Sequence, residues 1–240
     1  MSKSFGQVEK KTLEAEFFFN KFKDAYRSNT LFESECYFNS FIASSRSITM
    51  TIQYCLKKAD GFEIWYSNQQ KKLKNCELAK LFLELRNRSV HRGENFAFSL
   101  VWNEKDNGHH YLESWFSPLN GFKLFPSKTS EDILSSSKEY FCLLLGIVQA
   151  CYVDFGKIID PDQYWSFDNI ASKNWTCEDI EQMLGFPRGW TKVTGQSEET
   201  RMEFLIQQAR SSNSVYCPLE PLFEKYLNVN KYGIEYNTND

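Results

Sequence analysis

This chain has few of the residues that usually mark metal or redox chemistry. Only three histidines occur in 240 residues, and no two of the seven cysteines form a Cys-x-x-Cys pair. Because the cysteine count is odd as well, the sequence predicts neither a zinc site nor a disulfide framework. We expect reduced thiols in the core, with no metal and no cofactor.

The chain also lacks a strong net charge and a long apolar run. Its formal charge is −3, so any nucleic acid would have to bind a local basic patch. The longest apolar stretch, residues 140–153, contains Gly146 and Gln149 and is shorter than the roughly 20 residues of a membrane helix. The first residues carry no apolar signal-peptide segment. The sequence therefore predicts a cytoplasmic protein with no membrane partner.

What the chain does contain is abundant aromatic residues at helical spacing. The sequence includes 21 Phe and 12 Tyr, which favours a well-filled core. Residues 13–26 predict a helix with Phe18, Phe22 and Tyr26 on its apolar face. Further helices are predicted over residues 31–57, from an N-cap at Asn75 to about Val90, and over 130–159. Residues 62–67 form a short separate segment, and the charge run 71–74 predicts a solvated surface.

Residues 95–128 differ in character from these helices and predict a small β insertion. Alternating apolar residues indicate strands near 96–102, 111–116 and 122–125, with a turn at residues 106–108. Beyond residue 160, shorter helices are predicted near 177–184, 196–210 and 219–227. The expected fold is mainly α: an antiparallel helical bundle over residues 1–160, followed by a small helical appendage over 161–240.

The most informative motif is Arg86-Asn87-Arg88-Ser89-Val90-His91, at the end of an amphipathic helix. Residues four apart share a helix face, so Asn87 and His91 are expected to be neighbours. Arg86 lies five positions before His91 and is rotated away on an ideal helix. Unwinding of the helix end near Gly93 would let both side chains reach one cleft.

These residue types suit RNA cleavage without a metal. RNA supplies its own nucleophile, the 2′-hydroxyl, and an imidazole can take or return its proton near neutral pH. An arginine fork can bind the phosphate and stabilise the charge that develops as the oxygen attacks. A purely structural interpretation stays open, in which His91 interacts with the helix end and Arg86 pairs with Glu84 or another surface acid.

The stretch from Leu83 to Gly93 resembles the motif of the HEPN superfamily, in which Arg, a polar residue and His follow one another within four to six positions. The resemblance covers about residues 10–95 and, more loosely, 130–160. It implies a HEPN-like bundle, catalytic roles for Arg86, Asn87 and His91, and a homodimer with a composite cleft. It also implies RNase activity in a toxin or defence context, with a nucleotidyltransferase antitoxin as a possible partner. Arg88, Arg92 and Arg46 would then bind RNA.

A second segment, Trp175 to Thr191, is similar to a C-terminal region of DNA cytosine-5 methyltransferases, and residues 212–219 resemble that family's closing segment. The chain has neither a Gly-rich cofactor loop nor a Pro-Cys nucleophile pair, which argues against methyl transfer. Two interpretations stay open: a helical packing module, and a DNA-binding accessory region in which Arg188 and Lys192 contact phosphate.

Three functions follow from these patterns. The first is a metal-independent endoribonuclease of HEPN type. The second is a non-catalytic HEPN-type binding or scaffold protein that uses the same helices. The third is an accessory subunit of a DNA-modification system, which residues 175–220 alone suggest.

Overall fold

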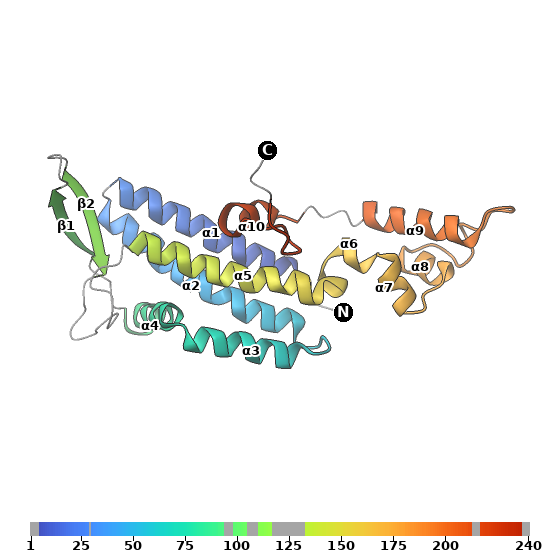
Figure 1. Ribbon diagram of the computed structural model, residues 1–240, viewed down its shortest axis with the longest axis horizontal. Coiled ribbons are helices and arrows are strands. Elements are labelled where there is room, and N and C mark those ends of the chain that lie inside the picture. The colour runs from blue at the N-terminus through green and yellow to red at the C-terminus, as the bar shows by residue number, and fades with distance from the viewer. Residues whose placement is uncertain are drawn as a thin grey trace. The chain divides into compact units, whose positions relative to one another are not determined.

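The computed structural model describes residues 5–28, 30–93, 98–104, 110–116, 133–212 and 217–236 (Figure 1). The chain divides into two compact units, Met1–Val148 and Gln149–Asp240. This division falls within a helix, α5 (Ile133–Ile159). The boundary predicted at residue 160 coincides instead with the end of that helix. The described residues are mainly helical, as the composition and periodicity predict.

The first unit contains four helices and the start of α5. They are α1 (Gly6–Arg27), α2 (Leu31–Leu56), α3 (Phe62–Asn75) and α4 (Glu77–Arg92). α1 packs along α2, and α4 contacts both α2 and α3 (Figure 1). An aromatic cluster joins these helices: Phe82 of α4 stacks on Tyr140 of α5 at a ring-centroid distance of 4.3 Å, and Phe38 and Phe41 of α2 lie against Phe82.

α1 begins earlier than predicted and buries a different face. Its buried residues include Val8, Ala15, Phe19 and Phe22, whereas the predicted face included Phe18, which stays partly exposed. Val8 and Ala15 continue the three- and four-residue spacing back toward Gly6, so the apolar face that runs through Phe19 has the larger buried area.

The prediction of a short separate segment at residues 62–67 is wrong. The segment 62–67 and the charge run 71–74 form one continuous helix, with Phe62, Tyr66 and Gln69 buried. Lysine and glutamine are good helix formers, so a charged exposed face does not interrupt a helix whose other face is anchored. Asn75 ends this helix, and Cys76 has the extended backbone of the α4 N-cap without a side-chain cap hydrogen bond. The predicted capping role of Asn75 is wrong.

Two strands follow α4. β1 (Phe98–Glu104) and β2 (His110–Phe116) pair antiparallel, with Phe98 opposite Phe116 and Glu104 opposite His110. The predicted turn at 106–108, the predicted third strand at 122–125 and the predicted start of the next helix at 130–132 lie outside the described residues.

α5 is the most apolar helix of the described chain. Its length and composition would let it cross a membrane, a property that core helices of soluble proteins share. In the part of α5 that belongs to the first unit, Phe141, Leu145 and Val148 are fully buried. Asp160 then ends the helix and accepts a hydrogen bond from the backbone N–H of Asp162, which starts a new short helix at once. The end predicted for this helix, at residue 159, is confirmed.

The second unit contains the end of α5 and five shorter helices: α6 (Pro161–Tyr164), α7 (Phe167–Ser172), α8 (Cys177–Met183), α9 (Glu198–Ser212) and α10 (Glu220–Leu227). Thr176 and Asp179 form a capping box at the start of α8, as the sequence predicts. A small core joins α7, α8 and α9 through Ile170, Ile180 and Leu205.

Candidate active site at the end of α4

α4 carries the motif because one of its faces is anchored in the core. Its apolar residues Leu78, Leu81, Phe82 and Leu85 are all buried, as predicted. The helix then stops at Gly93, whose φ of +63° lies in the left-handed region that residues with a Cβ rarely adopt. The N–H of Gly93 bonds the carbonyl of Ser89, so the last turn stays closed. The motif therefore sits on a rigid helical turn.

Three side chains of this turn meet. The guanidinium Nη1 of Arg86 lies 3.2 Å from Oδ1 of Asn87 and 3.2 Å from Nε2 of His91. α4 stays helical through Arg92, so no unwinding is needed. The predicted unwinding is wrong because the long arginine side chain reaches across the five-residue separation.

A guanidinium has only donors, so a hydrogen bond between Arg86 and His91 requires Nε2 of His91 as the acceptor, with the ring proton on Nδ1. His91 is exposed to solvent, whereas Arg86 and Asn87 are half-buried. A ligand that approaches α4 from solvent meets the imidazole and the guanidinium together.

A further atom of Arg86, its Nε, is buried and has no hydrogen-bond partner among the described residues. A buried donor without a partner costs about 1–3 kcal/mol, more when the group is charged. Asn39, Ser45 and Ser137 also have a buried polar atom without a partner among the described residues, so this feature is not specific to Arg86.

The other predicted cations lie in different surroundings. Nε of Arg88 lies 2.9 Å from a carboxylate oxygen of Glu84. The ion pair with Glu84 is therefore formed by Arg88 and not by Arg86. Arg92 is exposed at the end of the helix. Arg46, on α2, is half-buried and donates to Oγ1 of Thr49 at 3.0 Å. Arg46 lines a cavity and makes no described contact with Arg86 or His91.

Comparison with known protein families gives one match. A family model described as bacteriophage lambda protein ea47 matches residues 5–115. This region is similar to that phage protein and contains α1 to α4, β1 and all three residues that meet at the end of α4. No curated protein and no solved structure matches the chain.

The region 175–220 is organised by a buried ion pair that the sequence alone did not indicate. Glu181 and Arg201 are 0% and 2% exposed, and their charged atoms lie 3.0 Å apart. The carboxylate of Glu181 also accepts hydrogen bonds from the backbone N–H groups of Gly189 and Thr191. The turn after α8 is thereby tied to α9. Arg188, one of the predicted phosphate ligands, bonds Asp179 and Gln182 instead.

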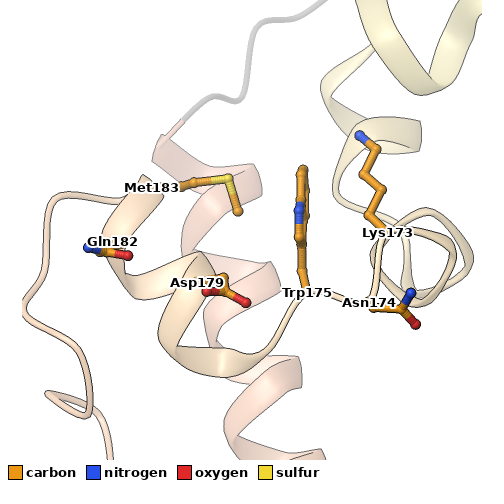
Figure 2. A pocket seen from close by; sticks show the side chains of 6 residues that line it. All are labelled: Lys173, Asn174, Trp175, Asp179, Gln182 and Met183. Atoms are coloured by element: carbon orange, nitrogen blue, oxygen red, sulfur yellow. The ribbon is translucent and has the colours of Figure 1, made fainter.

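A wide depression of about 590 Å³ lies beside this turn. Figure 2 shows the Trp175 ring standing between Lys173 and Met183, with the Asp179 side chain below it. The Lys173 ammonium lies 4.4 Å from the centroids of both Trp175 and Tyr164. Burial lowers the pKa of Lys173. Because Asp179 is already bonded to Thr176 and to Arg188, this depression offers an aromatic face without an available acid.

Proposed function

We propose that this protein is a metal-independent endoribonuclease of HEPN type, and that the end of α4 is its active site. The observation that carries the proposal is the convergence of Arg86, Asn87 and His91, with one guanidinium nitrogen 3.2 Å from both partners. This arrangement contains a phosphate ligand and a proton acceptor on one solvent-facing turn.

The proposed reaction needs only these groups and the RNA. A bound phosphate would take the donors of Arg86 and release Nε2 of His91 from the guanidinium. The released nitrogen would accept the 2′-hydroxyl proton as that oxygen attacks the adjacent phosphorus. Arg86 would stabilise the charge on the phosphate oxygens. The bond from phosphorus to the 5′-oxygen would break as the new bond to the 2′-oxygen forms, and the leaving 5′-oxygen would take the proton that His91 had accepted. Asn87, through its contact with Arg86, would hold the guanidinium in place.

The surroundings of the site favour a second copy of the chain beside it. Leu83 and Val90 lie on the same side of α4 as Arg86 and are 41% and 52% exposed. Apolar side chains that flank an exposed charged site are suited to bury against a partner. In a two-fold dimer each copy would add its own Arg86 and His91 to one cleft. The similarity of residues 5–115 to a phage protein is compatible with a defence or toxin role.

The decisive experiment measures cleavage of a labelled RNA by the purified chain in EDTA. We expect wild-type protein to cut, and His91→Ala to lose at least a hundredfold of the rate, the scale of a general acid–base contribution of roughly 10²–10⁴. His110→Ala is the matched histidine control and should cut as wild type does. Circular dichroism should show equal folding of all three proteins.

Two results would contradict the proposal. Cleavage that persists in His91→Ala would remove the role of this residue. Absence of cleavage by wild type, together with an intact dimer in both proteins, would instead favour the non-catalytic scaffold function.

A further inference from the structure

A cavity of about 310 Å³ opens between α2, α3, α4 and α5 in the first unit. Its volume lies at the lower end of the roughly 300–1,000 Å³ that small-molecule sites occupy. The proposed nuclease site does not use it. Ala79 and Leu83 of α4 line it, about two turns and one turn before Arg86 along the helix.

The polar lining of this cavity is cationic. Arg46, Lys74 and Lys80 line it, and none of its lining residues is acidic. Lys80 is bonded to Glu77 at 2.6 Å and is therefore partly neutralised. Arg46 donates from Nη1 to Thr49, and its other N–H groups have no partner among the described residues. Lys74 likewise has no described partner. An anion is the ligand that these donors can satisfy.

Apart from these cations and the neutral polar residues Thr49 and Gln70, the wall is mostly apolar. Leu73, Leu83 and Leu144 line the cavity, together with the ring of the buried Tyr140. The Tyr140 hydroxyl has no hydrogen-bond partner among the described residues. Burial raises the pKa of Tyr140 to about 12, and the positive charge of Arg46 opposes that shift, so the two groups are close. The phenol stays protonated at neutral pH and is a further donor.

We infer that this cavity binds a small organic anion, in which one carboxylate or phosphate group is attached to a compact apolar group. Arg46 and Lys74 hold the anionic group, and the leucine side chains cover the body. The site does not depend on RNA cleavage, because Asn87 and His91 take no part in it. Either an aliphatic chain or a flat ring fits this chemistry, since both a leucine wall and a tyrosine ring are present.

The test is calorimetric titration of the full chain with octanoate and with 1-naphthoate. Octylammonium and octanol serve as probes with the same chain and a different head group. We expect at least one of the two anions to bind ten times more tightly than octylammonium and octanol. The anion that binds more tightly identifies the body that the cavity accepts.

Two variants locate the bound anion. Arg46→Gln and Lys74→Gln should each weaken anion binding about tenfold or more, since a hydrogen bond to a charged group contributes about 1.5–3 kcal/mol. Lys74 is exposed, so its substitution does not endanger folding. Lys72→Gln, on the same helix but outside the cavity, is the matched control and should bind as wild type does.

The inference fails if neither anion binds more tightly than octylammonium, or if Lys74→Gln and Lys72→Gln bind alike. His91→Ala should keep the full anion affinity. The result is therefore independent of the ribonuclease assay, and each proposal can fail while the other stands.

Discussion

Replacing Glu181 by Gln should destabilise the α8–α9 region. The Glu181 carboxylate is fully buried and accepts hydrogen bonds from Arg201, from two backbone N–H groups and from the Thr191 hydroxyl. Glutamine keeps the shape of the side chain but places an NH₂ group where donors already point. It also removes the negative charge that compensates the 2% exposed Arg201.

The size of this effect follows from the surroundings of Arg201. Removing one partner of a buried ion pair costs about 3–5 kcal/mol. Arg201 would still contact Glu178 at 2.8 Å and Glu198 at 3.1 Å, so part of its charge stays compensated. We therefore expect the lower end of that range, about 3 kcal/mol in the free energy of local unfolding.

Hydrogen exchange with mass spectrometry can measure this loss region by region. Peptides from residues 177–212 should exchange about a hundredfold faster in Glu181→Gln, since about 1.4 kcal/mol corresponds to a factor of ten. Glu198→Gln is the matched control: its carboxylate is 66% exposed, and a surface ion pair contributes about 1 kcal/mol or less. Equal exchange in the two variants would refute the reasoning.

The same pair sets a pH dependence. Burial alone raises the pKa of Glu181, but hydrogen bonds from Thr191, Arg201 and Gly189 outweigh it and lower the pKa to about 2. Because the pKa of Glu181 is lower in the folded protein than the unfolded value of 4.5, its ionised carboxylate stabilises the fold above about pH 4.5. This contribution is lost as the pH falls from 4.5 toward 2. The protection of α8 and α9 against exchange, taken relative to the intrinsic exchange rate at each pH, should fall over that window in wild type, and much less in Glu181→Gln.

Four further substitutions, one of them a control, test the first unit, the turn after α8 and the proposed active site. Phe82→Ala should lower the free energy of unfolding of the first unit by about 3–5 kcal/mol, because the Phe82 ring is 1% exposed and stacks on Tyr140. The control Phe17→Ala, at a residue that is 52% exposed, should change it by less than about 0.5 kcal/mol. Urea unfolding measures both. Gly189→Ala should destabilise α8–α9 by about 1–2 kcal/mol, because its φ is +80°; hydrogen exchange of residues 177–212 reports it, and unchanged exchange would argue against the loop geometry. Arg86→Lys keeps the positive charge but loses the paired N–H donors of the guanidinium, so it should lower the rate of RNA cleavage by about tenfold to a hundredfold. A wild-type rate would show that a single positive charge suffices.

Several elements were predictable because their signals are local. The bounds of α2, the buried stripe of α4 and the stop at Gly93 follow from spacing and from one residue that tolerates positive φ. The capping box at the start of α8 is likewise local, because Thr176 and Asp179 form it within four consecutive residues. The motif at residues 86–91 was found in the same way, and its residues do meet in the structure.

Other features depend on partners far away in the sequence. The apolar pattern of α1 was predicted one residue out of phase, since the choice between Phe18 and Phe19 depends on the core that α2 and α5 provide. The cavity at Arg46 draws its residues from four helices, so no sequence window shows its cationic lining. The pairing of Glu181 with Arg201 joins positions 20 residues apart, and only the burial of both gives it energetic weight.

The sequence by itself determined that the chain is mainly α and which residues stand at the end of α4. It also gave the bounds of α2, α4, α8, α9 and α10 to within a few residues. These are properties of hydrogen bonds and side-chain spacings within a few residues. Tertiary structure alone decided that Glu181 pairs with Arg201 in a buried site and that a cavity without acidic lining residues forms beside Tyr140. Both depend on burial by helices that lie apart in the sequence, which no local pattern encodes.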